Sequence, residues 1–261
     1  MELITSKENK TIKYIKKLLS SASLRREEGL FAAEGVRLCT DALISGATVV
    51  TALFSESFAG KDAAFVGRTQ AVCRECYAVR DSIFSALSDT KTPQGVLFVI
   101  KRLDKTLDFD TMKKNGKILA LESIQDPVNL GTILRSAEAL GADAVVLSRD
   151  CCDIYAPKVI RGSMGAVFRL PFMTTGDLPA YIARFNRIGT SYAAVLDRDS
   201  SIVQECDFSS LTLCALGNEG NGLTAETAAA CTHKLYIPMA GGAESLNVSA
   251  AAAIILWEMI R

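Results

Sequence analysis

The feature that most constrains this chain is the alternation of apolar strands with helices after residue 117. Strands separated by helices predict an α/β fold with a mostly parallel sheet that is covered on both faces. The periodicity predicts strands at 118–121, 144–147, 192–196, 213–216 and 235–237, and helices at 130–140, 178–187, 224–230 and 247–260. Ligands bind beyond the carboxyl ends of strands in such sheets, so the loops after these strands are the candidate functional segments.

The residues before this sheet predict a second, smaller α/β module. Its predicted strands are 29–35, 48–54 and 95–100, and its predicted helices are 10–19 and 36–44. The stretch 101–117 is charged and contains a helix breaker, which is typical of a linker. We therefore expect a domain at 1–102, a linker at 103–116 and a second domain at 117–261.

Charge and residue counts exclude several classes of function. The 261 residues include 29 basic and 29 acidic side chains, which excludes a strongly basic nucleic-acid binder but allows a locally basic surface. The apolar content of 49% is too high for a disordered chain. Because His233 is the only histidine, a histidine-based metal centre or a Ser-His-Asp hydrolase would depend on that residue alone.

Cysteine spacing and hydropathy give two further expectations. Cys73 and Cys76 form a CxxC pair, but a structural zinc site needs four ligands and no second pair exists, so we expect no metal. No apolar run reaches the ~18 residues of a membrane span, and the N-terminus lacks the apolar core of a secretory signal. We therefore expect a cytoplasmic protein with reduced cysteines and no membrane partner.

The first loop with candidate chemistry follows the strand at 118–121. A polar turn with Pro127 leads into a helix that is expected to begin near Asn129, whose side chain can cap it. Arg135 lies two turns further along, among small and apolar residues. It is either a surface residue or a guanidinium that holds a phosphate through two hydrogen bonds.

The other two loops contain glycine turns. After the strand at 213–216, three glycines let a ligand approach the backbone, in a spacing that does not match the dinucleotide motif GxGxxG. These glycines are Gly217, Gly220 and Gly222. Glu219 is the lone carboxylate among them. The third loop presents Ser245 and Asn247 before a helix whose four alanines at 250–253 let another backbone pack closely.

These loops resemble the motifs of the SpoU/TrmH family of RNA ribose 2′-O-methyltransferases, within the SPOUT class. The matching segments are NLGTILRSA (129–137), LGNEGNGL (216–223) and IPMAGGAESLNVSAA (237–251), in the family's order and spacing. The resemblance covers about 118–261. More weakly, RREEGLFAAEGVRLCTDAL in the first half is similar to the substrate-binding domain of these enzymes, which resembles RNA-binding ribosomal proteins.

The resemblance implies a fold and a cofactor. The family's C-terminal sheet contains a trefoil knot, which general topology rules would rate very improbable. In the family the knot holds S-adenosylmethionine, largely through backbone groups. Carried over by motif position, the expected cofactor-binding residues are Leu216, Gly217, Gly220, Ile237, Met239, Leu246 and Asn247. Backbone contact agrees with the glycine-bearing turns.

The resemblance also implies methyl transfer to a ribose hydroxyl, with ribosomal RNA preferred to transfer RNA as substrate. The expected catalytic residues are Arg135, Asn129, Glu219, Ser245 and Asn247. Because a guanidinium stays protonated in proteins, we expect Arg135 to orient the phosphate and ribose of the target nucleotide and not to act as a base. Glu219 is either the base or a carboxylate that accepts hydrogen bonds from loop N–H groups.

Two surfaces have alternative interpretations. The basic stripe, defined as Lys13, Lys16, Lys17, Arg25 and Arg26, is either a solvated helix face or a surface that contacts RNA phosphates. The resemblance implies a homodimer that packs through the C-terminal helices and completes the site with residues of both chains. The alanine-rich helix suits that packing, and it equally suits an ordinary core.

Two rival functions compete with RNA methylation. One is a non-catalytic RNA-binding protein that retains the fold, and the intact Arg135, Glu219 and Asn247 argue against it. The other is a different nucleotide-dependent enzyme, and the absence of both GxGxxG and GxxxxGK[ST] argues against that.

Overall fold

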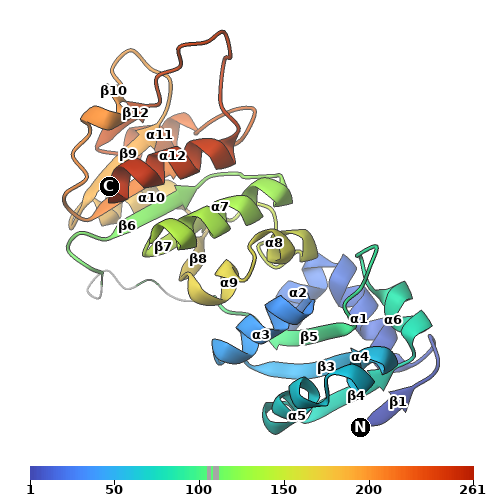
Figure 1. Cartoon of the computed structure of the whole chain (residues 1–261). Coiled ribbons are helices and arrows are strands. Elements are labelled where there is room, and N and C mark those ends of the chain that lie inside the picture. Colours follow the sequence, from blue (N-terminus) through green and yellow to red (C-terminus); the bar gives the residue numbers. More distant parts are fainter. Residues whose placement is uncertain (105–106, 108–111) are drawn as a thin grey trace. The chain divides into compact units, whose positions relative to one another are not determined.

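The computed structural model describes residues 1–104, 107 and 112–261, which pack as two compact units. Unit 1 comprises Met1–Leu103 and Tyr155–Phe168, and unit 2 comprises Asp104–Ile154 and Arg169–Arg261 (Figure 1). The predicted linker at 103–116 lies in part outside the described residues. The sequence placed Tyr155–Phe168 in the second domain, whereas in the structure this segment packs with unit 1.

Unit 1 is built on a mixed five-stranded sheet. Its strands are β1 (Glu2–Ile4), β2 (Leu30–Glu34), β3 (Val49–Ser55), β4 (Glu75–Val79) and β5 (Val96–Lys101), in the order β1-β4-β3-β5-β2. Its helices are α1 (Lys10–Ser20), α2 (Ala22–Glu28), α3 (Val36–Ile44), α4 (Glu56–Lys61), α5 (Ala63–Val72), α6 (Asp81–Leu87) and α8 (Pro157–Gly162). β5 runs antiparallel to β2 and β3, and the other pairs are parallel. Every strand and helix predicted for this half is present.

Side chains of the unit 1 sheet alternate between two apolar layers, as the two-residue period of a strand requires. Leu53 of β3 faces one layer, where it shares a core with Leu18 of α1. The next residue, Phe54, faces the other layer, and its ring centroid lies 6.4 Å from that of Phe65 on α5 and 6.3 Å from that of Phe98 on β5. Helices therefore cover both faces of this sheet.

The segment Tyr155–Phe168 joins unit 1 through aromatic packing. The ring centroid of Phe31 on β2 lies 4.7 Å from that of Tyr155 and 6.2 Å from that of Phe168. The Tyr155 hydroxyl accepts a hydrogen bond from the backbone N–H of Leu103 at 2.6 Å. Tyr155 and Phe31 are both fully buried, so their contact removes a large apolar area from water.

Arg25 differs from the other members of the basic stripe because its side chain is buried, with 5% exposed. Its Nη1 donates to the backbone carbonyls of Leu18 and Leu19 at 2.6 and 3.0 Å. Carbonyls in the last turn of a helix lack intrahelical donors and favour a positive charge. Arg25 therefore secures the end of α1, whereas Lys13, Lys16, Lys17 and Arg26 are exposed.

Unit 2 is built on a seven-stranded sheet in which each pair of neighbouring strands is parallel. Its strands are β6 (Lys117–Leu121), β7 (Ala144–Ser148), β8 (Phe172–Thr175), β9 (Thr190–Ala194), β10 (Ser201–Ile202), β11 (Thr212–Leu216) and β12 (His233–Tyr236), in the order β10-β12-β9-β11-β6-β7-β8. Its helices are α7 (Pro127–Leu140), α10 (Leu178–Phe185), η2 (Val203–Glu205), α11 (Ala225–Ala230) and α12 (Val248–Ile260), and α9 (Ala166–Arg169) ends at its boundary. The predicted parallel α/β sheet is confirmed, and β8 and β10 are additions to it.

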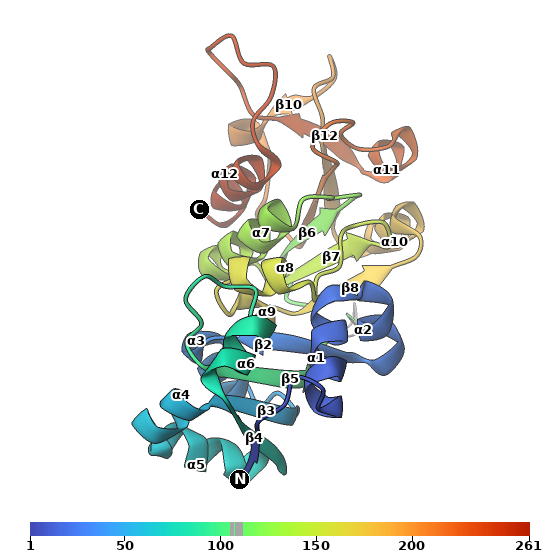
Figure 2. The ribbon, with the colours of Figure 1, turned by 90° about the vertical axis from the view of Figure 1, so that its right-hand side faces the viewer.

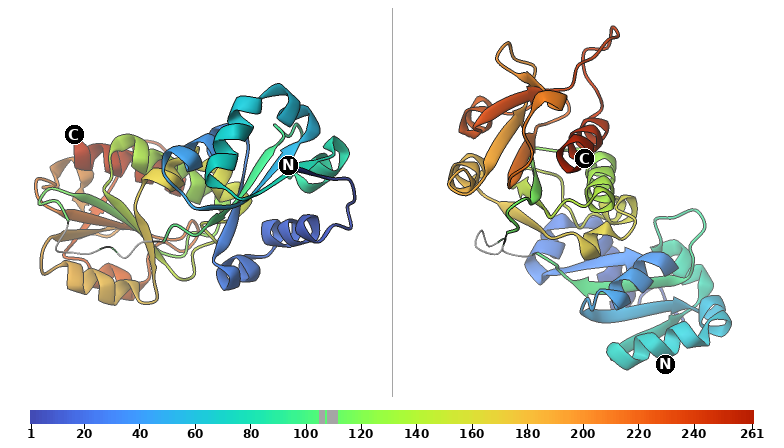
Figure 3. Two further views of the ribbon diagram at one scale, coloured as in Figure 1. Left: turned by 90° about the horizontal axis from the view of Figure 1, so that it is seen from below. Right: turned by 60° about the vertical axis from the view of Figure 1, so that its left-hand side comes forward.

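Helices cover both faces of the unit 2 sheet. α7 and α12 lie side by side on one face, and α10 and α11 lie on the other (Figure 2 and Figure 3). Each residue of β6, β7 and β11 is buried, which explains the continuous apolar runs at 118–121, 144–147 and 213–216 within these strands. In the central pairing, Leu121 of β6 lies opposite Leu216 of β11, so the loops after both strands leave the sheet at the same edge.

We expect Arg25→Gln to lower the free energy of unfolding by about 2 kcal/mol, because it removes charge-assisted hydrogen bonds to buried carbonyls. Urea unfolding followed by circular dichroism measures this change. The matched control is Arg26→Gln on the exposed neighbour, which should change stability by less than about 0.5 kcal/mol. Equal unfolding midpoints for the two variants would contradict the structural role of Arg25.

Candidate active site

Two of the candidate loops begin at neighbouring strand ends. Glu122 directly follows β6, and its N–H donates to the carbonyl of Leu216 at the end of β11, at 2.9 Å. From this point one loop runs into α7, and the glycine loop, defined as Gly217–Leu223, runs toward α11. The parallel pairing thus gathers the polar residues of both loops at the carboxyl edge of the sheet.

The helix α7 begins at Pro127 instead of near Asn129. Asp126 caps it, since Oδ1 accepts from the N–H of Val128 at 2.8 Å, and proline suits the first helical position because it needs no donor there. The prediction that Asn129 caps this helix is therefore wrong. Asn129 lies in the first turn with 7% of its surface exposed, and its amide points to other loops.

A chain of side-chain hydrogen bonds, the polar bridge, joins Asn247, Asn129 and Glu219. Asn247 Nδ2 donates to Asn129 Oδ1 at 2.9 Å, and Asn129 Nδ2 donates to Glu219 Oε1 at 3.0 Å. Asn247 Oδ1 accepts from the N–H groups of Ser249 and Ala250, so the same side chain caps α12. Each amide uses both its nitrogen as a donor and its oxygen as an acceptor, so the orientation of both amide groups is fixed. The polar bridge also connects all three loops.

Glu219 is held as an acceptor. Besides Asn129, the backbone N–H groups of Gln125 and Asp126 donate to its carboxylate at 3.4 and 3.3 Å, just before α7. Burial raises the pKa of Glu219, but the hydrogen bonds from Asn129 and from backbone N–H groups lower the pKa by more, so its net direction is downward. A carboxylate with a lowered pKa is a weak base. Of the two roles expected from the sequence, this geometry favours the accepting role.

The glycine loop makes a tight reversal. Asn218 and Gly222 exchange backbone hydrogen bonds at 2.9 and 3.0 Å, and Gly222 has a φ of +69°. A Cβ atom on Gly217 would lie 2.0 Å from the carbonyl carbon of Gly222 and 2.2 Å from the nitrogen of Leu223. No side chain fits there, so glycine is required at 217. At Gly220 a Cβ would meet only Asn218 Oδ1 at 3.6 Å.

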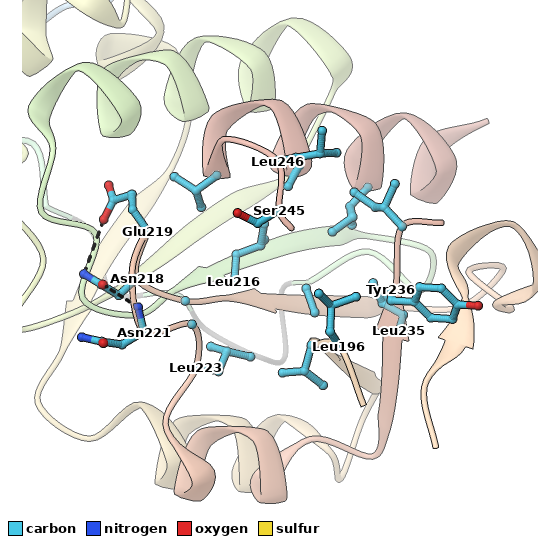
Figure 4. A pocket seen from close by; sticks show the side chains of 18 of the residues that line it. Leu196, Leu216, Asn218, Glu219, Asn221, Leu223, Leu235, Tyr236, Ser245 and Leu246 are labelled. Carbon is cyan, nitrogen blue, oxygen red and sulfur yellow. Dashed lines mark hydrogen bonds between the residues drawn. The ribbon is translucent and has the colours of Figure 1, made fainter. Parts of the chain in front are cut away.

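An apolar cavity of about 390 Å³ lies beside the glycine loop. Six of the seven expected cofactor residues line it, namely Leu216, Gly217, Gly220, Ile237, Met239 and Leu246. In Figure 4, leucine side chains line the middle of this cavity, with Asn218 and Glu219 at one end and Tyr236 at the other. The cavity therefore combines an apolar wall with the backbone of the glycine loop.

A polar cavity of about 430 Å³ adjoins the apolar one. It is lined by Gln125, Asp126, Asn129, Glu219, Ser245, Leu246, Asn247 and Val248. Glu219, Ser245, Leu246 and Val248 line both cavities, which makes them the boundary. Four of the five expected catalytic residues are thus brought together.

Arg135 is the expected catalytic residue that lines neither cavity. It is exposed on α7, about two turns beyond Asn129. Among the described residues, no carboxylate pairs with its guanidinium. By contrast, Arg161 and Arg169 on the same chain form ion pairs with Asp89 and Glu138.

Several lining residues were not predicted from the sequence: Gln125, Asp126, Asn218, Leu196 and Tyr236. Asp126 before Pro127 is a helix-start signal that identifies its capping role. Within the described ranges, no cluster of three or more His, Cys, Asp or Glu side chains is placed to hold a metal ion. No helix in the described part of the chain has the length and apolar character needed to cross a membrane.

Each half of the chain matches the model of a known protein family. Residues 116–257 match the model of the SpoU rRNA Methylase family, and residues 9–97 match the MRM3-like substrate binding domain. The chain is 32% identical to the 23S rRNA (guanosine(2553)-2′-O)-methyltransferase RlmP of Bacillus subtilis over 99% of each chain. It is 31% identical to the 23S rRNA (uridine(2479)-2′-O)-methyltransferase of Streptomyces viridochromogenes, over 94% of this chain and 87% of that one.

A solved structure is similar along the whole chain. The AdoMet-bound rRNA methyltransferase from Sinorhizobium meliloti superposes with a TM-score of 0.89 at 29% identity, covering 99% of this chain and 97% of that one. The family match, the parallel sheet and the two adjoining cavities agree with one another. The chain therefore belongs to the SpoU rRNA methylase family and is a methyltransferase.

Proposed function

We propose that this chain methylates the 2′-hydroxyl of a ribose in ribosomal RNA, with S-adenosylmethionine as the methyl donor. The observation that carries the proposal is the boundary between the two cavities, where Glu219, Ser245 and Leu246 line an apolar compartment on one side and a polar one on the other. A methyl donor and a hydroxyl acceptor held in the two compartments meet at that boundary.

The apolar cavity fits the proposed cofactor. Its volume lies within the ~300–1,000 Å³ range of small-molecule sites, and its leucine side chains offer apolar surface to a purine ring. Gly217 is buried at the start of the glycine loop and Gly220 is exposed at its tip, and both line the cavity, so a ligand can approach the loop backbone. When bound, S-adenosylmethionine supplies the electrophilic methyl group. The residues of the protein therefore bind the cofactor and orient its methyl group toward the acceptor.

The polar cavity fits a nucleotide. Asn129 and Asn247 present amide groups in fixed orientations, and Ser245 adds a hydroxyl group at the boundary. Such groups orient a ribose hydroxyl toward the apolar side. Glu219 accepts hydrogen bonds that hold Asn129, and the hydroxyl proton passes to a phosphate oxygen, to water or to another residue.

We further propose that the enzyme is a homodimer that packs through α12. Trp257 is 59% exposed on this helix, and Ile254 and Ile260 are also exposed. Arg135 lines neither cavity of its own chain, which agrees with a site completed by residues of both chains. In this arrangement Arg135 orients the phosphate and ribose of the nucleotide held by the other chain.

Unit 1 supplies the proposed RNA-binding surface. Lys13, Lys16, Lys17 and Arg26 are exposed, and they contact RNA phosphates without reading sequence. The match to a substrate binding domain supports this assignment. The two relatives named above act on a guanosine and on a uridine, so the target base is not assigned.

Mapping of ribose methylation tests the function. Ribosomal RNA from cells that lack this protein should be missing at least one 2′-O-methyl group, and the purified protein with S-adenosylmethionine should restore it. If the two methylation maps are identical and the protein still binds the RNA, the non-catalytic RNA-binding alternative is correct.

Gly217→Ala should weaken S-adenosylmethionine binding at least about tenfold, because a Cβ at this position forces the glycine loop to change shape. Isothermal titration calorimetry measures the dissociation constant. Gly67→Ala on α5 of unit 1 is the control, since a Cβ there has open space around it and the residue lines neither cavity. Similar affinities for both variants would remove the glycine loop from the cofactor site.

Arg135→Ala should lower kcat at least about a hundredfold and leave cofactor affinity nearly unchanged, since the guanidinium acts on the RNA phosphate. Methyl transfer from labelled S-adenosylmethionine gives kcat, and calorimetry gives the affinity. Arg187→Ala, at an exposed arginine of unit 2, is the control. Full activity of Arg135→Ala would show that this assignment is wrong.

A further inference from the structure

A buried carboxylate at the end of β6 has no part in the proposed reaction. Glu122 is 6% exposed, and its Oε2 accepts from the backbone N–H of Thr224 at 2.7 Å. Its Oε1 accepts from the hydroxyl of Thr224 at 2.9 Å and also from the hydroxyl of Thr227. In the described part of the chain no lysine or arginine pairs with it. Three neutral donors therefore stabilise this charge.

The contacts of Glu122 hold the glycine loop at both ends. Its backbone N–H donates to the carbonyl of Leu216, immediately before the loop. Its carboxylate binds Thr224, immediately after the loop. Thr224 is also the N-cap of α11, so the loop exit is tied to a helix start. One residue thus spans the base of a loop that lines the apolar cavity.

The adjacent Ser123 holds the interior of the same loop. Its carbonyl accepts from Asn218 Nδ2 at 2.8 Å, and Asn218 Oδ1 accepts from the N–H of Gly220 at 2.9 Å. Ser123 has a φ of +55°, a left-handed conformation that non-glycine residues rarely adopt. Ser148 Oγ fixes this conformation by accepting the N–H of Ser123 at 2.9 Å. The corner between β6 and α7 therefore braces the loop at its base and along its length.

We propose that Glu122 is a positioning residue for the cofactor: its carboxylate sets the shape of the glycine loop and thereby the affinity for S-adenosylmethionine, without contact to the reacting atoms. The inference rests on the proposed function, because it takes the glycine loop as a cofactor-binding loop. Hydrogen bonds to a carboxylate are about twice as strong as those to a neutral amide. When they weaken, the loop populates other shapes, and the apparent affinity falls with the fraction in the binding shape.

The test replaces Glu122 with glutamine, which keeps the length and removes the charge. Glu122→Gln should raise the dissociation constant of S-adenosylmethionine about tenfold, the factor that follows from losing about 1.4 kcal/mol. The KM for S-adenosylmethionine should rise by the same factor, whereas RNA affinity and kcat at saturating cofactor should stay within about threefold. The matched control is Glu226→Gln, which removes an exposed carboxylate from α11 and should change none of these values.

A second variant tests the same interaction with a smaller change. Thr227→Val removes one buried donor to Glu122 while keeping the side-chain shape, and it should raise the cofactor dissociation constant about threefold. It decides the question if Glu122→Gln does not fold.

Three outcomes would overturn these assignments. Folded variants that bind the cofactor like the wild type would overturn the inference alone. Equal losses of cofactor and RNA affinity would also overturn it, because they indicate a general structural role. A wild-type protein that does not bind S-adenosylmethionine would overturn the proposed function, and this inference with it.

Discussion

The parallel pairing of β6 with β11 is the interaction on which the active site depends. The two strands are far apart in sequence, yet their backbone hydrogen bonds set Leu121 beside Leu216 and end both strands at one edge of the sheet. Each later contact follows from this register: Glu122 reaches the end of the glycine loop, and Glu219 reaches the start of α7. A shift of this pairing by one residue would displace the two strand ends relative to each other, and with them the loops that carry these carboxylates.

The charges of the site are stabilised by neutral groups. Glu219 accepts from an amide and from backbone N–H groups, and Glu122 accepts from a backbone N–H and hydroxyls. The residues that line the polar cavity include the carboxylates of Asp126 and Glu219 and no lysine or arginine. In the proposed function, attraction for a polyanion therefore comes from outside this cavity, from the lysines of unit 1 and from Arg135. Under that proposal, different parts of the chain attract the RNA and position the reacting groups.

Local pattern predicted the regular elements well. The helix at 36–44 has the bounds expected from apolar periodicity, and α12 begins one residue after the predicted start because Asn247 is its cap. The glycine loop, Glu219 and Asn247 were located by motif, and the structure brings them together. The trefoil knot stays a prediction.

The features that the sequence did not reveal depend on tertiary contacts. From the sequence, Arg25 is expected to be an exposed cation like its neighbours. In the structure it is buried because its guanidinium donates hydrogen bonds to carbonyls at the end of the preceding helix. The sequence assigns the segment Tyr155–Phe168 to the second domain. In the structure it packs with unit 1 through contacts of Tyr155 and Phe168 with Phe31. Asn129 reads as a cap, and it contacts residues about a hundred positions away in sequence, which no local pattern records.

The double use of Asn247 has a consequence for the order in which the enzyme matures. Its side chain caps α12 with one end and holds Asn129, 118 residues earlier, with the other. On the ribosome, β6, α7 and the glycine loop emerge before α12 exists to fix that amide. Before α12 forms, Asn129 can already donate to Glu219, but its carbonyl oxygen still lacks the donor that Asn247 supplies. The polar cavity, which Asn247 helps to line, is therefore completed by the last helix of the chain.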